Sequence, residues 1–222
     1  MYSRRIIQEL LEWKNDANRK PLILRGARQV GKTSAVKQFS TAYKNYIYLN
    51  LEKRQDAELF VDYQSIDALV DAIFFLRNVN TNQKADTLLF IDEIQEIPEA
   101  INVLRYFFED YPEIHVIAAG SLLETILNEN ITIPVGRVSF KVLRPVCFEE
   151  FLGAMGETAA LEQYHTIPTP DFSHTKMMDL FNTYSLIGGM PEIVKSYAST
   201  KNLSLLKPIY ESLLRAYFSK SF

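Results

Sequence analysis

Residues 26–33 read Gly-Ala-Arg-Gln-Val-Gly-Lys-Thr, a complete GxxxxGK[ST] loop, and the sequence on either side completes the pattern. Upstream, residues 22–24 form the short apolar run Leu-Ile-Leu, which predicts a buried strand. Downstream, Val36, Phe39 and Tyr43 recur at helical spacing. A strand, a glycine loop and a helix in this order are the context in which the motif binds phosphate. We therefore predict a phosphate-binding loop between the first strand and the following helix.

Each specified position of the GxxxxGK[ST] pattern has its own physical reason. Gly26 and Gly31 allow backbone turns at which a side chain would clash, so that successive N–H groups can face one anion. The N-terminus of the following helix adds positive potential. Lys32 can reach the β- and γ-phosphates of a nucleotide, and the Thr33 hydroxyl can coordinate Mg²⁺. The predicted nucleotide-binding residues are Gly26, Ala27, Arg28, Gln29, Val30, Gly31, Lys32, Thr33 and Ser34.

Composition indicates an ordinary soluble globular protein. The chain has 222 residues, of which 47% are hydrophobic and 23% charged, and its formal net charge is −3. Basic residues are scattered, so there is no nucleic-acid footprint at the level of the whole chain, although a local patch remains open. The single cysteine, Cys147, cannot form an intrachain disulfide, which fits a reducing compartment. No apolar run suits a signal peptide or a membrane span. We expect a cytoplasmic protein without membrane contact.

Apolar runs that alternate with helical patterns predict an α/β fold with a mostly parallel, five-stranded sheet. Strands are expected at residues 22–24, 46–51, 87–91, 114–119 and 138–143. Helices are expected near residues 6–11, 33–43, 65–74 and 98–108. Ser65 is the predicted N-cap of the third of these helices. The fourth is predicted to begin at Pro98 and to turn Phe108 inward. Ligands of such sheets bind at the carboxyl ends of the strands, where the glycine loop falls.

The character of the sequence changes after about residue 151. Residues 156–171 contain Pro-Thr-Pro-Asp and are interpreted as a linker or loop, and helical patterns follow at 177–186, 191–197 and 203–218. We predict an ATPase core at residues 1–155 and a helical segment at 156–222, forming a helical lid or part of a winged helix. Because the chain stops directly after an apolar helical stretch, we expect it to be truncated before a second domain.

Two acidic residues follow the third predicted strand, which reads Leu-Leu-Phe-Ile at positions 88–91. This pattern resembles a Walker B element. Asp92 and Thr33 are the predicted metal-binding residues, with Mg²⁺ retaining several of its waters. Glu93 is the predicted general base that orients and deprotonates the attacking water. The alternative is a pair of solvated acids at a strand end, one of which caps the next helix.

The residues around the acidic pair favour ATP hydrolysis over two other reactions. A GTPase should show Asp-x-x-Gly after this strand and Asn-Lys-x-Asp after a later one, but Asp92 is followed by Glu-Ile-Gln. The nearest guanine-like string, at residues 83–86, precedes the acidic strand. A small-molecule kinase needs an acceptor site and a lid of basic residues, and nothing in the sequence marks such a site. Adenine is therefore favoured over guanine, and hydrolysis over phosphotransfer.

Two further residues are candidates for the catalytic machinery. Ser121 follows the fourth predicted strand, where a hydroxyl can sense the γ-phosphate; the string Ser-Leu-Leu-Glu at 121–124 equally fits a capping box that opens a helix. Arg137 precedes the fifth strand and is the best candidate for an arginine that neutralises transition-state charge, supplied from a neighbouring subunit. Arg144 and Arg28 are weaker candidates, and a surface role for Arg137 stays open.

With these residues assembled, the chain resembles prokaryotic AAA-like ATP-binding proteins of the additional-strand, catalytic-glutamate class. The shared strings lie at residues 25–33, 90–95, 119–123, 135–137, 143–152 and 188–194, in the expected order along most of the chain. The resemblance implies a P-loop NTPase core of three αβα layers that binds and hydrolyses ATP. Members typically continue with a winged-helix-like segment and a C-terminal domain related to restriction-endonuclease folds. By this resemblance, we expect that second half to be missing from the present sequence.

Two functional hypotheses follow. The first is an ATPase that uses ATP and Mg²⁺ at Lys32, Thr33, Asp92 and Glu93 to drive a conformational switch of the C-terminal segment. The alternative is a nucleotide-gated interaction module that holds ATP or ADP without turnover, in a DNA-directed system. ATP and ADP are the expected ligands. A homo-oligomer and DNA are candidate partners, and the net charge gives DNA no support.

Overall fold

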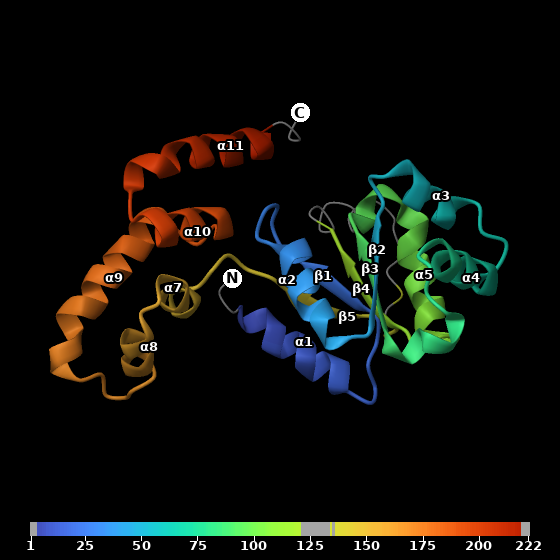
Figure 1. Ribbon diagram of the computed structural model, residues 1–222, viewed down its shortest axis with the longest axis horizontal. Helices are drawn as coiled ribbons and strands as arrows, with labels where there is room; N and C mark the ends of the chain where they lie inside the picture. The colour runs from blue at the N-terminus through green and yellow to red at the C-terminus, as the bar shows by residue number, and fades with distance from the viewer. Residues whose placement is uncertain (1–3, 121–133, 135, 219–222) are drawn as a thin grey trace. The chain divides into compact units, whose positions relative to one another are not determined.

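The computed structural model describes residues 4–120, 134 and 136–218, and its first part is built on a five-stranded sheet (Figure 1). The strands are β1 (Leu22–Arg25), β2 (Asn45–Asn50), β3 (Thr87–Asp92), β4 (His115–Ala119) and β5 (Ser139–Val142). Their order in the sheet is β2-β3-β4-β1-β5, and every neighbouring pair is parallel. The predicted α/β fold is confirmed, and the sheet is entirely parallel rather than mostly so.

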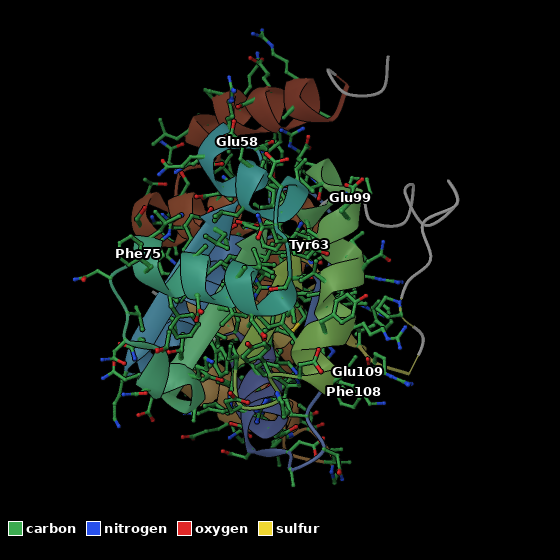
Figure 2. The ribbon with its side chains drawn as sticks, turned by 90° about the vertical axis from the view of Figure 1, so that its right-hand side faces the viewer. Glu58, Tyr63, Phe75, Glu99, Phe108 and Glu109 are labelled. Atoms are coloured by element: carbon green, nitrogen blue, oxygen red, sulfur yellow. The ribbon has the colours of Figure 1, made fainter. Side chains whose placement is uncertain are left out.

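Helices cover both faces of the sheet, as crossover connections between parallel strands require. They are α1 (Arg5–Asn15), α2 (Lys32–Phe39), α3 (Arg54–Val61), α4 (Ile66–Leu76) and α5 (Pro98–Glu109). Short 3₁₀ turns accompany them: η1 (Ser40–Ala42), η2 (Thr81–Asp86) and η3 (Ile94–Glu96). Figure 1 shows α1 and α2 on one face and α3, α4 and α5 on the other, and Figure 2 views the α3–α5 face directly. The result is the three-layer αβα arrangement of a P-loop NTPase.

The central strands are apolar along their whole length because both of their faces are covered. All six residues of β3 and all five of β4 are buried. Phe60 of α3, Phe74 of α4 and Phe107 of α5 pack against one face in a single core. The edge strand β5 alternates between half-buried and exposed residues, which is typical of a strand with one neighbour.

The sheet register decides which loops meet. Leu24 of β1 lies beside Ala119 of β4, Ile91 of β3 beside Ala118 of β4, and Asn50 of β2 beside Asp92. The carboxyl ends of these four strands therefore lie along one edge. The loop that follows β1 and the acidic residues that end β3 both emerge there, as the parallel arrangement predicts.

Several helix predictions hold and others need correction. The Ser65 hydroxyl accepts a hydrogen bond from the Ala68 N–H at 3.2 Å, so Ser65 is the N-cap of α4 as predicted. The α5 helix begins at Pro98, but the buried ring near its end is Phe107, while Phe108 is only half-buried. The α3 helix was not predicted, because its eight residues carry little helical periodicity of apolar side chains.

The C-terminal residues form a second, all-helical unit. Its elements are α7 (Phe148–Met155), α8 (Thr158–Tyr164), η4 (Asp171–Ser173), α9 (His174–Ile187), α10 (Pro191–Thr200), η5 (Leu203–Leu206) and α11 (Lys207–Phe218). The predicted linker at 156–171 is wrong in its first half, where α8 buries Ala160 in the helical core. Among the residues described after Arg144 no strand is found, so the segment is helical as predicted, and its being part of a winged helix stays a prediction.

The chain divides into two compact units. One contains Ile6–Ala27 and Lys32–Leu143; the other contains Arg28–Gly31, the chain from Arg144 onward and the residues that precede Ile6. This division assigns α7 to the helical unit, whereas the domains predicted from the sequence, 1–155 and 156–222, assign it to the core. Within the described residues, no helix has the length and apolar character needed to cross a membrane.

Candidate nucleotide-binding site

The backbone of the loop between β1 and α2 takes up conformations that ordinary residues avoid. The φ angles are 151° at Gly26 and 91° at Gly31, both in the region that favours glycine. Gln29, which has a side chain, also lies there with φ of 63°. Left-handed residues between α- and β-type neighbours turn consecutive N–H groups toward one side, which forms an anion-binding concavity. The loop conformation thus matches the reason for its two glycines.

Lys32, the first residue of α2, directs its ammonium group back onto the loop. The side chain is buried, and Nζ donates to the backbone oxygens of Gly26 at 2.8 Å and Ala27 at 3.1 Å. These carbonyl oxygens hold the positive charge at the loop itself. A phosphate oxygen that enters the loop would offer the same ammonium a stronger, charge-assisted acceptor.

Thr33 and Asp92 meet although they are far apart in the sequence. The Thr33 hydroxyl donates to Asp92 Oδ2 at 2.8 Å, and the Tyr48 hydroxyl donates to the same oxygen at 3.2 Å. Burial raises the pKa of Asp92 above its usual value, and the Thr33 hydrogen bond partly opposes this. Burial and the carboxylate also raise the pKa of Tyr48, to about 12, so it stays a donor. A hydroxyl and a carboxylate this close are oxygen ligands of the kind that Mg²⁺ prefers.

Glu93 is held in a strained backbone conformation directly after β3. Its φ of 53° and ψ of 44° are left-handed, which is uncommon for a residue other than glycine, asparagine or aspartate. Gln95 Nε2 donates to Glu93 Oε2 at 2.6 Å and so orients the carboxylate. The Gln95 side chain is itself buried, and its Oε1 has no hydrogen-bond partner among the residues that the structure describes. Strain of this sort is typical of functional residues.

Comparison with known families decides the identity of the chain. Residues 18–152, which span the sheet, the loop and the acidic pair, match the AAA domain family. The chain belongs to the AAA domain family. It is therefore an AAA-type domain of the P-loop class, a class that binds ATP. A comparison with curated proteins gives no match.

Solved structures share the fold of this AAA domain. A Walker-type ATPase of Pyrococcus abyssi is 17% identical, with a TM-score of 0.57 over 100% of this chain and 77% of that chain. Drosophila ORC, solved bound to DNA, is 16% identical, with a TM-score of 0.52 over 92% of this chain and 61% of that chain. At these identities the likeness concerns the architecture alone.

The remaining predicted residues of the AAA domain are placed as follows. Ser34 is exposed on α2, and Val30 is fully buried within the loop. Arg137 is exposed and pairs at 2.9 Å with Glu109, the last residue of α5. Figure 2 labels Glu109 on that helix. Ser121 lies outside the described residues, so its two interpretations stay predictions. The role of Arg137 as an arginine that neutralises transition-state charge from a neighbouring subunit also stays a prediction.

Two residues of the site were missed in the sequence. Tyr48 contacts Asp92 because β2 lies beside β3, and Gln95 contacts Glu93 because η3 turns back after the strand. Tyr48 lies on the strand predicted at residues 46–51, but its contact with Asp92 depends on the order of strands in the sheet, which was not predicted from the sequence. No sequence pattern pointed to Gln95, since a glutamine two residues after an acidic residue occurs in many contexts without contacting it.

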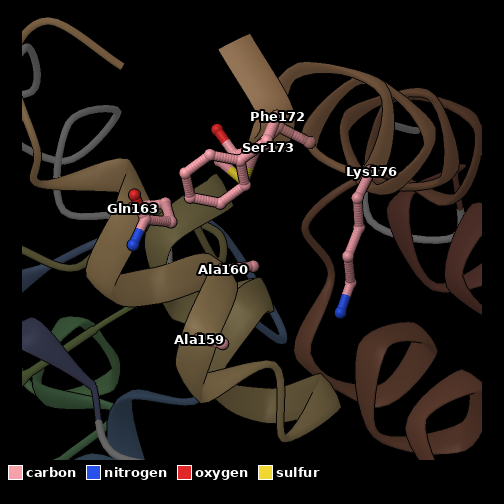
Figure 3. Close-up of a pocket in the computed structure, with 7 residues that line it drawn as sticks. Ala159, Ala160, Gln163, Phe172, Ser173 and Lys176 are labelled. Carbon is pink, nitrogen blue, oxygen red and sulfur yellow. The ribbon is translucent and has the colours of Figure 1, made fainter. Parts of the chain in front are cut away.

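An apolar pocket lies in the helical unit, where Figure 3 shows it between α8, η4 and α9. It is lined by Ala159, Ala160, Gln163, Phe172, Ser173, Lys176 and Met177. None of these is a predicted site residue, and the lining offers only one cationic side chain, Lys176, which pairs with Glu157 at 2.5 Å. This pocket lacks the converging donors that a triphosphate needs, so it is not assigned to the nucleotide.

Proposed function

We infer that this AAA domain binds ATP with Mg²⁺ at the loop of residues 26–33 and hydrolyses it. The observation that carries the proposal is the hydrogen bond between Thr33 and Asp92 at 2.8 Å, directly beside the loop and the buried Lys32. The motif alone supports phosphate binding. The loop together with the Asp92 carboxylate and the general-base candidate Glu93, both at the carboxyl end of β3, supports hydrolysis.

Binding is the task of the loop and the first turn of α2. The loop N–H groups donate to the phosphate oxygens, and Lys32 exchanges its carbonyl partners for the β- and γ-phosphates. The Thr33 hydroxyl and the Asp92 carboxylate would hold Mg²⁺, which neutralises phosphate charge when bound. No group of three or more His, Cys, Asp or Glu side chains in the described parts of the chain forms a metal site of its own.

In the proposed hydrolysis, Glu93 is the general base. Its carboxylate accepts a proton from a water molecule as the water oxygen forms a bond to the γ-phosphorus. The bond between that phosphorus and the β–γ bridging oxygen breaks, and ADP and inorganic phosphate result. Gln95 orients the carboxylate through its 2.6 Å hydrogen bond. An arginine from a second copy, with Arg137 as the candidate, would stabilise the charge that develops on the phosphoryl oxygens.

We further propose that hydrolysis drives a conformational switch of the helical residues, in a cytoplasmic setting, with a homo-oligomer or DNA as partner. The Drosophila ORC structure is described as bound to DNA, and this is the reason to include DNA in the assay. The domain division at residue 155 and a C-terminal restriction-endonuclease-like domain remain predictions from the sequence and play no part in the chemistry proposed here.

The test compares four variants for ATP binding by calorimetry and for phosphate release. Lys32→Ala should bind Mg²⁺–ATP at least about tenfold more weakly, because a charge-assisted contact is lost. Its control is Lys37→Ala, which removes an exposed lysine of the same helix. Glu93→Gln should bind ATP and lose turnover by about 100-fold or more, with the exposed Glu99→Gln as control.

Each outcome decides one part of the proposal. If Lys32→Ala binds as tightly as the unaltered chain, the loop is not the ATP site. If Glu93→Gln retains turnover, Glu93 is not the base. Binding without turnover in the unaltered chain, at every protein concentration and with or without DNA, would identify a nucleotide-gated interaction module. A rate that rises with protein concentration would support the arginine supplied in trans.

A further inference from the structure

Arg4 lies before the first helix, yet it contacts the nucleotide loop. The side chain is buried, and its guanidinium group uses all three nitrogens. Nε donates to Glu150 Oε1 at 3.0 Å, Nη2 donates to the Arg144 backbone oxygen at 2.7 Å, and Nη1 donates to the Val30 backbone oxygen at 3.3 Å. The last contact reaches the residue immediately before Gly31 of the phosphate loop.

Glu150 holds this arginine in place. Its side chain is buried; Oε1 accepts from Arg4 and from the Arg5 backbone N–H at 2.8 Å, and Oε2 accepts from the Cys147 N–H at 3.0 Å. The last of these contacts is one half of a capping box at the start of α7. This buried carboxylate has three donors, and the Arg4 guanidinium is the charged one among them. The pair has one favourable geometry, because displacing either side chain leaves a buried charge unpaired.

Peptide geometry converts the Arg4 contact into an orientation of the loop. The Val30–Gly31 peptide is planar and trans, so its oxygen and its N–H point in opposite directions. With the Val30 oxygen held toward Arg4, the Gly31 N–H points away from Arg4. Gly31 has a φ of 91°, which a residue with a Cβ rarely adopts, although a Cβ there would make only ordinary contacts with Pro191 Cγ at 3.8 Å and Arg4 Nη1 at 4.0 Å.

We propose that Arg4 and Glu150 are a positioning pair that orients the Val30–Gly31 peptide so that its N–H is available to the phosphates of ATP. The inference rests on the proposed nucleotide function of the loop and adds two residues outside the motif to it. It also makes nucleotide affinity depend on the segment before α1 and on the first turn of α7. Neither residue touches the nucleotide in this account.

The main test measures Mg²⁺–ATP affinity by calorimetry in Arg4→Gln, Arg4→Lys, Glu150→Gln and the double variant Arg4→Gln/Glu150→Gln. Arg4→Gln should weaken binding by about tenfold, since it removes a charged donor from the peptide. Arg4→Lys should recover only part of this loss, because an ammonium group cannot serve three partners in a fork. If the two residues act as one unit, the double variant should bind no more weakly than Arg4→Gln alone.

Arg19→Gln is the matched control. Arg19 likewise donates to two backbone oxygens, Lys14 at 3.3 Å and Pro112 at 2.8 Å, but it precedes β1 and lies away from the loop. It should lower thermal stability without changing ATP affinity. If Arg4→Gln and Arg19→Gln bind ATP equally well, or if the losses of Arg4→Gln and Glu150→Gln simply add, the positioning role is refuted.

Amide hydrogen exchange without nucleotide separates this inference from the proposed function. Peptides that cover residues 26–33 should exchange faster in Arg4→Gln than in the unaltered chain, and at the unaltered rate in Arg19→Gln. Lys32→Ala is measured alongside for ATP affinity. If Lys32→Ala binds ATP normally, the loop is not the ATP site. Amide hydrogen exchange of residues 26–33 still reports whether Arg4 holds the loop in that case. Unchanged exchange in Arg4→Gln overturns the inference even if ATP binds as proposed.

Discussion

At the scale of single residues, the site departs from local conformational preference at two positions. Gln29 and Glu93 adopt left-handed backbone conformations without being glycine. Each conformation costs roughly 1–2 kcal/mol relative to glycine, since Cβ crowds the neighbouring carbonyl oxygen. The surrounding fold imposes these conformations: Glu93 follows a fully buried strand, and its carboxylate is held by Gln95. Local conformational preference therefore fails at these two residues of the proposed site, the kind of place where such departures are expected.

Glu93 gives a direct test of this strain. Glu93→Ala and Glu93→Gly both remove the carboxylate, but only glycine adopts φ of 53° without a steric penalty. We expect Glu93→Gly to be more stable than Glu93→Ala by about 1 kcal/mol in urea unfolding. Neither variant should hydrolyse ATP. Equal stabilities would mean that the backbone at residue 93 relaxes once the side chain is shortened.

At the scale of elements, the turn between α9 and α10 depends on a glycine for packing. The Val146 N–H donates to the Gly189 oxygen at 2.7 Å, and the Tyr184 hydroxyl donates to the Val146 oxygen at 2.9 Å. A Cβ at Gly189 would lie 2.3 Å from that Val146 oxygen, which is not a tolerable contact. The segment before α7 and the turn before α10 thus approach backbone to backbone. Gly188, with φ of 67°, supplies the change of direction.

Two glycine-to-alanine changes in the helical unit should therefore have opposite effects. Gly189→Ala should destabilise the chain by about 2 kcal/mol or more, because the backbone of Val146 has to move. Gly153→Ala lies within α7 with nothing near its added Cβ, and it should stabilise by about 0.5–1 kcal/mol through helix propensity. Thermal unfolding measures both. A neutral Gly189→Ala would show that the two segments can separate at little cost.

At the scale of the whole molecule, the sheet unit contains a buried histidine that couples its stability to pH. The His115 ring nitrogen Nδ1 lies 2.5 Å from the Tyr43 hydroxyl, and the ring packs edge-on against Trp13. Burial, followed by the positive charges of Arg19 and Lys14, lowers the pKa of His115 to about 4. The native state therefore keeps this ring neutral at pH values where an unfolded chain would protonate it.

The sign of the pH effect follows from the two pKa values. Above about pH 6.5, the usual histidine pKa, neither state binds the proton and the full stability is present. As the pH falls from 6.5 toward 4, the unfolded state gains a proton that the native state does not, so the free energy of unfolding decreases, by up to about 3 kcal/mol.

Urea unfolding at pH 7 and at pH 4.5 checks this for the unaltered chain and for His115→Gln. Acidic groups also titrate in this range, so the quantity of interest is the difference between the two proteins at each pH. His115→Gln should lose less stability on acidification than the unaltered chain. Equal losses would mean that His115 is protonated in the native state or that it is not responsible for the effect.

The sequence predicted the strands to within one or two residues; the central strands β3 and β4 are buried on both faces and are therefore continuously apolar. It also predicted the Ser65 cap and the entry of α5 at Pro98, which depend on neighbouring residues only. It failed for α8, whose surroundings of proline and glycine resemble a loop; a tertiary core that buries Ala160 stabilises this short helix. Rules based on local sequence patterns do not predict contacts between residues that are far apart in the sequence.

The same distinction separates what each level decided about this protein. The sequence by itself determined the α/β fold and, as predictions, the phosphate-binding loop and the acidic end of the third strand, because these depend on contiguous residues and on periodicity. Only the tertiary structure decided that Thr33 meets Asp92, that Tyr48 joins them, and that Arg4 reaches Val30. The physical reason is that strand order and side-chain packing choose partners that lie many residues apart, and no local pattern encodes that choice.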